Sequence, residues 1–133
     1  PMPIRVVHAN PRVRENAGHV AIQRGPVVYC LESVDHLDVS IFDIVLPLDS
    51  SESLTAFQSR FESDLLGGIV TISADALAYG AAPSEEKLYS FDGFHPPGKS
   101  VRMKAIPYFA WANRGPSEML VWIPWIFQLT TGY

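Results

Sequence analysis

The stretch GHVAIQRGPVVYCLE, residues 18–32, consists of two short apolar runs separated by the dipeptide Gly25-Pro26. Short runs rich in Val, Ile and Tyr are typical of β-strands, and a Gly-Pro pair between them is typical of a turn. The stretch therefore predicts strands at residues 20–23 and 27–32. In the second strand, alternation predicts two opposite faces: Val27, Tyr29 and Leu31 on one, and Val28, Cys30 and Glu32 on the other.

The same pattern of short apolar runs and turn residues continues along the chain. It predicts further strands at residues 4–8, 41–46, 69–73, 101–106, 108–112 and 119–123. Residues 54–64 are ambiguous, because their aromatic positions fit one face of a helix as well as one face of a strand. We favour a strand, since a lone helix between strands is the less economical arrangement.

Two segments are predicted to be irregular. Residues 75–100 contain Gly and Pro at frequent intervals and predict one long surface loop with at most one short strand. Residues 113–117 (NRGPS) lie between two aromatic runs and predict a hairpin turn. The whole pattern favours an all-β fold, an antiparallel β-sandwich of jelly-roll type.

Composition excludes several classes of function. The chain has 133 residues, of which 47% are apolar and 18% charged. This length and composition predict one globular domain. The net charge is −4 and the basic residues never cluster, so we expect no nucleic-acid partner. The longest apolar stretch, residues 119–129, is interrupted by Pro124 and is too short to span a membrane, which needs roughly 20 residues.

The single cysteine, Cys30, excludes an internal disulfide and a zinc site built from cysteines of this chain. Its apolar neighbours predict a buried thiol, and one thiol weakly favours a reducing compartment such as the cytoplasm. The first residues carry no signal-peptide pattern. Because the chain opens without Met and already in strand-like sequence, we expect a fragment of a longer protein.

Candidate acidic and metal sites are weak in the sequence. Glycosidases need two carboxyl groups about 5 to 9 Å apart, and the nominal pairs are Glu32 with Asp35 and Glu85 with Glu86. We interpret these four as solvated surface charges. The closest metal-like group is Asp35, His36 and Asp38, which we interpret as a turn with a solvated histidine. We therefore predict no catalytic, cofactor-binding or metal-binding residue.

Aromatic side chains near the C-terminus are the best candidates for a binding surface, because flat aromatic faces stack on sugars. In a strand, Tyr108 and Trp111 would point to opposite faces, so one of them is expected in the core. Arg114 could pair with a carboxylate across an interface. The candidate contacts with carbohydrate or with another surface are Tyr108, Trp111, Arg114, Trp122 and Trp125.

Three motifs occur in order along the chain. They are residues 18–32 with Val34-Asp35, LLGGIV at residues 65–70, and KAIPYFAWANRGP at residues 104–116 followed by EM at 118–119 and VWIP at 121–124. In this order they resemble the C-terminal region of the β-L-arabinofuranosidase family, glycoside hydrolase family 127 and relatives. Residues 125–133 match nothing in that pattern, so we expect a domain over residues 1–124 and a C-terminal tail over residues 125–133.

The resemblance implies an (α/α)6 barrel followed by β-sandwich modules, with catalysis confined to the barrel. The family's site is expected to use a cysteine nucleophile, a glutamate acid/base and a zinc ion held by cysteines and a glutamate. None of those motifs is present here, and Cys30 lies in a strand motif instead. Any zinc is therefore expected in the catalytic domain of the parent protein and not in this chain.

We thus expect a non-catalytic β-sandwich domain that supports the catalytic barrel of a β-L-arabinofuranosidase-like hydrolase. The chain alone is expected not to be an enzyme. Its expected partners are that barrel and a second copy of the chain. An independent carbohydrate-binding module, with a glycan as the ligand, is the alternative.

Overall fold

The computed structural model describes residues 3–9, 18–48, 57–79 and 99–127, and these ranges contain nine strands and three 3₁₀ turns. The strands are β1 (Ile4–His8), β2 (His19–Arg24), β3 (Val27–Glu32), β4 (Ile44–Leu48), β5 (Gln58–Glu62), β6 (Ile69–Ala78), β7 (Lys99–Pro107), β8 (Met119–Leu120) and β9 (Ile123–Phe127). The 3₁₀ turns are η2 (Ser33–Asp35), η3 (Ile41–Asp43) and η5 (Tyr108–Ala110). Within the described ranges, no helix is long and apolar enough to cross a membrane.

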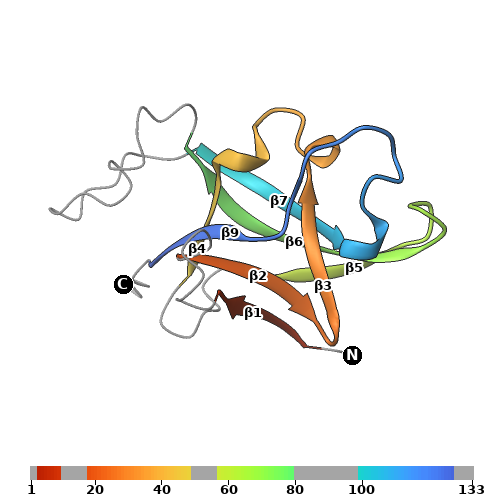
Figure 1. Cartoon of the computed structure of the whole chain (residues 1–133), viewed down its shortest axis with the longest axis horizontal. Helices are drawn as coiled ribbons and strands as arrows, with labels where there is room; N and C mark the ends of the chain where they lie inside the picture. Colours follow the sequence, from red (N-terminus) through yellow and green to blue (C-terminus); the bar gives the residue numbers. More distant parts are fainter. Residues whose placement is uncertain (1–2, 10–17, 49–56, 80–98, 128–133) are drawn as a thin grey trace, which may run out of the picture.

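Six of the strands close into a barrel. Their order is β2-β9-β4-β6-β7-β3, and β3 returns to β2 through the two-residue turn at Gly25 and Pro26 (Figure 1). Neighbouring strands run antiparallel except β4 and β9, which are parallel. Strands β1, β5 and β8 lie outside the ring, against β2, β6 and β3.

The expected all-β fold is confirmed, but a closed barrel takes the place of the expected sandwich. The difference arises from β9, which pairs with β2 on one side and with β4 on the other. This strand joins what would otherwise be two separate sheets, and closure leaves fewer exposed strand edges.

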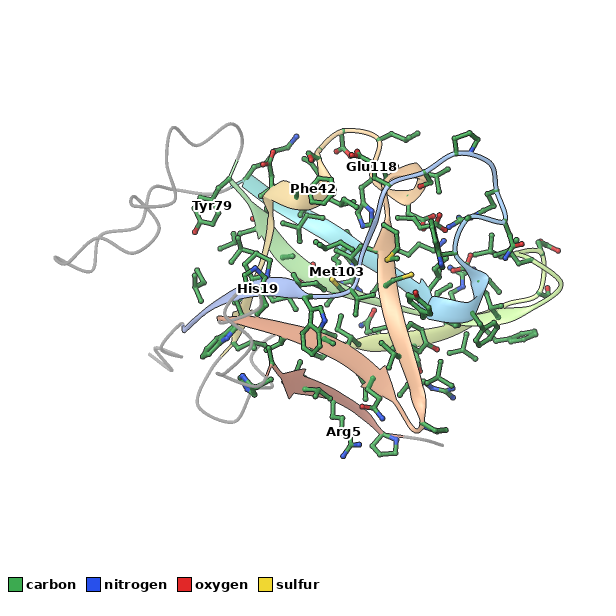
Figure 2. The ribbon with its side chains drawn as sticks, in the orientation of Figure 1. Arg5, His19, Phe42, Tyr79, Met103 and Glu118 are labelled. Carbon is green, nitrogen blue, oxygen red and sulfur yellow. The ribbon has the colours of Figure 1, made fainter. Side chains whose placement is uncertain are left out.

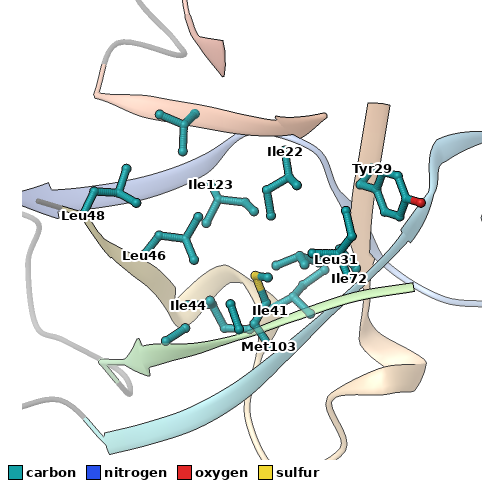
Figure 3. Close-up of a cluster of buried hydrophobic side chains, with 14 residues drawn as sticks. Ile22, Tyr29, Leu31, Ile41, Ile44, Leu46, Leu48, Ile72, Met103 and Ile123 are labelled. Carbon is teal, nitrogen blue, oxygen red and sulfur yellow. The ribbon is translucent and has the colours of Figure 1, made fainter. Parts of the chain in front are cut away.

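The main core fills the barrel and is shown in Figure 3. Tyr29 and Leu31 point into it, whereas Cys30 and Glu32 lie on the opposite face of β3, so the predicted alternation of this strand is confirmed for these residues. Met103 is buried inside the barrel, whereas Arg5 and Glu118 lie on the surface (Figure 2). Complete burial of a side chain such as Leu31 contributes about 2 kcal/mol.

A second, smaller core lies on the outer side of the barrel wall. Its members are Cys30, Ile69, Ile106 and Ala110, with Leu65, Leu66, Met119 and Val121 packed against them. Residues 108–121 thus cover the outer face of β3 and β7. This covering segment positions the candidate site.

Several predicted boundaries are corrected by the structure. Residues 41–43 form η3, and the strand that follows runs through Pro47, which lies opposite Ile126 of β9. The predicted strand in residues 54–64 is confirmed as β5, while residues 54–56 lie outside the described residues.

The loop expected over residues 75–100 is shorter at both ends. Strand β6 continues to Ala78 because Ala74, Ala76 and Ala78 alternate inward, while Asp75 faces outward opposite Arg102 of β7. Residues 80–98 lie outside the described residues.

The strand and hairpin expected over residues 108–117 are wrong. Residues 108–110 form η5, and the chain then runs as a loop to β8, which pairs with β3 instead of with a neighbouring hairpin strand. Strand β9 continues to Phe127, beyond the domain boundary expected at Pro124, and residues 128–133 lie outside the described residues.

Candidate functional site

Glu32, the last residue of β3, is a fully buried carboxylate. Alternation turns its side chain to the outer face of the barrel wall, under the loop that follows η5. One carboxylate oxygen accepts a hydrogen bond from the backbone N–H of Ala112 at 3.0 Å, and the other accepts one from Arg114 at 3.0 Å. The interpretation of Glu32 as a solvated charge is therefore wrong.

Arg114 joins Glu32 and Asp35, a pair of carboxylates that the sequence analysis had not connected with this arginine. Its Nη1 and Nη2 donate to the two oxygens of Asp35 at 2.7 and 2.8 Å, and Nη2 also donates to Glu32. The side chains of Asp35 and Arg114 are only 7% and 19% exposed. We call Glu32, Asp35 and Arg114 the Arg114 cluster.

The electrostatics of the Arg114 cluster favour a permanent ion pair. Hydrogen bonds to Asp35 raise the pKa of Arg114 above its usual value, with a smaller contribution from Glu32, and these outweigh the opposing effect of burial. Both oxygens of Glu32 are engaged and the residue is completely buried, so its carboxylate cannot reach a substrate. The cluster thus fixes the loop that follows η5 to the end of β3.

The loop held in this way carries further fixed contacts. Trp111 N–H donates to the carbonyl of Tyr108 at 3.2 Å, and the side-chain amide of Asn113 donates to the carbonyl of Ala110 at 2.9 Å. At its far end, Ser33 N–H donates to the carbonyl of Glu118 at 2.9 Å. These bonds fix residues 108–118 to the end of β3.

Three aromatic side chains project from η5 and the residue after it. Tyr108 is 46% exposed, Phe109 72% and Trp111 37%, whereas Ala110 between them is buried. The expectation that Tyr108 or Trp111 lies in the core is wrong, because a 3₁₀ turn replaces the strand on which it depended. Phe109 was missed, although it stands in the same aromatic run.

The other two predicted tryptophans lie elsewhere. Trp122 is partly buried in the segment before β9. Trp125, within β9, packs against the barrel core and meets the ring of His8 edge to face, with centroids 5.5 Å apart. The structure therefore groups Tyr108, Trp111 and Arg114 in one loop and leaves Trp125 with a packing role.

Cys30 lies in the smaller core, whereas Leu31, the next residue of β3, points into the main core. Burial raises the pKa of its thiol to about 12, and the negative charges of Glu32 and Asp35 act in the same direction. The thiol therefore stays protonated near neutral pH, which does not suit a nucleophile or a zinc ligand. Within the described ranges, no group of three or more His, Cys, Asp or Glu side chains could hold a metal ion.

His36 is buried and is not the solvated residue that was expected. Its Nε2 accepts from the backbone N–H of Lys104 at 3.1 Å, so the proton is on Nδ1, which donates to the carbonyl of Glu32 at 2.8 Å. The ring joins the end of β3 to β7, while Asp38 is exposed. Glu85 and Glu86, the other nominal acid pair, lie outside the described residues.

Comparison with known proteins agrees with the resemblance found in the sequence. The model of the glycoside hydrolase family 127 C-terminal domain matches residues 4–124. A non-reducing end β-L-arabinofuranosidase from Bifidobacterium longum is 38% identical over 122 residues, which cover 90% of this chain and 18% of the relative.

Solved structures give the same result. A family 127 β-L-arabinofuranosidase from Geobacillus stearothermophilus is 40% identical with a TM-score of 0.76, over 95% of this chain and 19% of that one. A second family 127 β-arabinofuranosidase is 35% identical with a TM-score of 0.75, over 95% of this chain and 18% of that one. The chain thus spans about a fifth of the length of these relatives. This chain belongs to the family of glycoside hydrolase family 127 C-terminal domains.

Proposed function

We propose that this chain is a non-catalytic domain that supports the catalytic part of a β-L-arabinofuranosidase-like hydrolase. The observation that supports this most directly is the Arg114 cluster, which engages the carboxylates of Glu32 and Asp35 in holding a loop. The reaction of the whole protein would be release of terminal L-arabinofuranose from glycans. It would belong to the four fifths of the relatives' length that this chain does not match. Any zinc would be bound there as well.

An assay of turnover tests this proposal. We expect no hydrolysis of an aryl β-L-arabinofuranoside by the isolated chain, and full hydrolysis by the longer protein that carries it. In the longer protein, Arg114→Met should lower thermal stability and leave kcat unchanged at low temperature. Turnover by the isolated chain that a substitution within it abolishes would refute the proposal.

We also propose self-association as part of the supporting role. Leu37 is 89% exposed and Phe42 52%, and apolar side chains of this size on a surface favour contacts between copies. Sedimentation of the isolated chain at high concentration should show dimers or larger species. A monomer at every concentration would count against this part of the proposal.

Carbohydrate binding is the second candidate, because Tyr108 and Trp111 both present exposed aromatic surface. It predicts binding to plant-type glycans that Trp111→Ala weakens without unfolding the domain. Flat titrations across a glycan panel would remove this candidate. Trp125→Ala is not a suitable test, since Trp125 packs against the barrel core.

A further inference from the structure

Three exposed aromatic side chains, Tyr108, Phe109 and Trp111, gather at one end of the barrel. Figure 1 shows η5 beside the hairpin of β5 and β6, and Ala110 of η5 shares the smaller core with Leu65 and Leu66 of that hairpin's turn. We call Tyr108, Phe109 and Trp111 the aromatic end.

The aromatic end is held in one conformation by buried charge. Glu32 binds the N–H of Ala112, Arg114 anchors the loop two residues later, and the backbone of Ala112 is in the left-handed region at φ +69°. A non-glycine residue in that region costs about 1 kcal/mol or more, so the loop conformation is imposed by its contacts. A turn fixed in this way loses little conformational entropy when it binds another surface.

The chemistry of this end favours a protein surface over a sugar. Phe109, the most exposed of the three aromatic side chains, has no group that could hydrogen-bond to a hydroxyl. The nearby carboxylates and guanidinium point inward and are engaged within the Arg114 cluster. Sugar sites need several converging polar groups, whereas the centres of protein interfaces are rich in aromatic side chains.

The occupant is indicated by the length of chain that lies outside this domain. Relatives are matched over 18% to 20% of their length, so about four fifths of such a chain remains to cover the surfaces of this domain. We propose that the aromatic end docks on an apolar surface of the remainder of the same hydrolase chain, with Phe109 as the central contact. This inference rests on the proposed function and identifies the surface through which the support is given.

Hydrogen exchange in the longer protein and in the isolated chain tests the docking. The amides of residues 108–111 should exchange at least about tenfold more slowly in the longer protein. Phe109→Ser in the longer protein should return these amides to the rates of the isolated chain. Leu37→Ser, which removes an even more exposed apolar side chain from a different loop, should leave them protected. Because Phe109 is 72% exposed, the isolated Phe109→Ser chain should melt at the temperature of the parent chain.

Equal exchange rates at residues 108–111 in the isolated chain and the longer protein would overturn the docking. Protection that arises only when an L-arabinofuranosyl oligosaccharide is added would assign the surface to a glycan and would overturn it as well. Failure of the proposed function would be seen separately, as turnover by the isolated chain, which hydrogen exchange does not report.

Discussion

Glu32 and Arg114 show how a small barrel accommodates buried charge. A carboxylate that is taken out of water is strongly destabilised unless opposite charge and hydrogen bonds compensate it. Arg114 compensates both Glu32 and Asp35, and the N–H of Ala112 adds a further bond. Loss of the arginine would therefore leave two buried carboxylates facing each other.

From this geometry we expect Arg114→Met to destabilise the isolated chain by about 3 to 5 kcal/mol in urea denaturation. The matched control is Arg102→Met, because Arg102 pairs with Asp75 at the surface, where the two side chains are 45% and 87% exposed. That pair should contribute less than about 1 kcal/mol. Similar losses for the two variants would contradict a stabilising role of the buried cluster.

Ala112 gives a second prediction at the scale of one residue. Its φ of +69° is unfavourable for alanine and suits glycine, so Ala112→Gly should stabilise the chain by about 1 kcal/mol. Gly115→Ala is the reverse control, since its φ is +97° and an added Cβ would meet no atom within 4 Å. It should destabilise by a similar amount. Thermal melting of both variants checks the signs, and a less stable Ala112→Gly chain would refute the backbone argument.

At the scale of the strands, Glu62 connects β5, β6 and β7. Its carboxylate accepts from the hydroxyl of Thr71 at 2.6 Å and pairs with Lys104 at 3.2 Å. The hydrogen bond from Thr71 is the main reason that the pKa of Glu62 lies below its ordinary value of 4.5, and Lys104 adds to it. The unfolded chain therefore takes up this proton at a higher pH than the folded chain does.

This order of protonation predicts how stability depends on pH. The contribution of Glu62 is complete above its ordinary pKa of 4.5 and is lost as the pH falls through the lower pKa of the folded state. Thr71→Val should therefore lower the free energy of unfolding at neutral pH. Its further decrease as the pH falls should be smaller than in the unchanged chain. Thr71→Ser, which keeps the hydroxyl, should retain most of the original profile. Urea denaturation from pH 7 to about pH 3 measures this, and matching profiles for Thr71→Val and the unchanged chain would contradict the assignment.

Individual strands differ in how well the sequence predicts them. The faces of β3 were predictable because alternating apolar residues have only one arrangement that buries Tyr29 and Leu31 together. Residues 108–112 were mistaken for a strand, since an aromatic run has high β-propensity whether or not it pairs. The 3₁₀ turn arises from contacts that the local sequence does not contain, above all the bond from Ala112 to Glu32, 80 residues away.

For the whole molecule, closure of the barrel depends on β9. This strand pairs with β2 and β4, and its Trp125 packs against the core and against the ring of His8 on β1. Trp125→Ala should destabilise the isolated chain by about 2 kcal/mol in urea denaturation, because it removes a large partly buried side chain. Trp111→Ala, at an exposed position, should cost less than about 1 kcal/mol. An equal cost at both positions would contradict the role of β9 in closure.

The family and the all-β class could be predicted from the sequence, whereas the candidate site could not. Three motifs were enough for the family, which the match over residues 4–124 confirms. Glu32 and Asp35 were considered as a pair, but Arg114 was considered separately, because 79 to 82 residues of chain separate it from these partners. Whether a charge is solvated or buried is decided by the fold, and local composition does not report it.

The place of β9 among the strands also has a consequence for how the domain reaches its folded state. Strand β2 pairs with its neighbours β1 and β3, but the rest of one edge is completed by β9, about one hundred residues later in the chain. Much of the ordering entropy is therefore lost before that contact can form. During synthesis on the ribosome, β2 and β4 therefore emerge with unsatisfied edges long before β9 does. Such a nascent chain has a high contact order and is prone to aggregation until β9 has been translated.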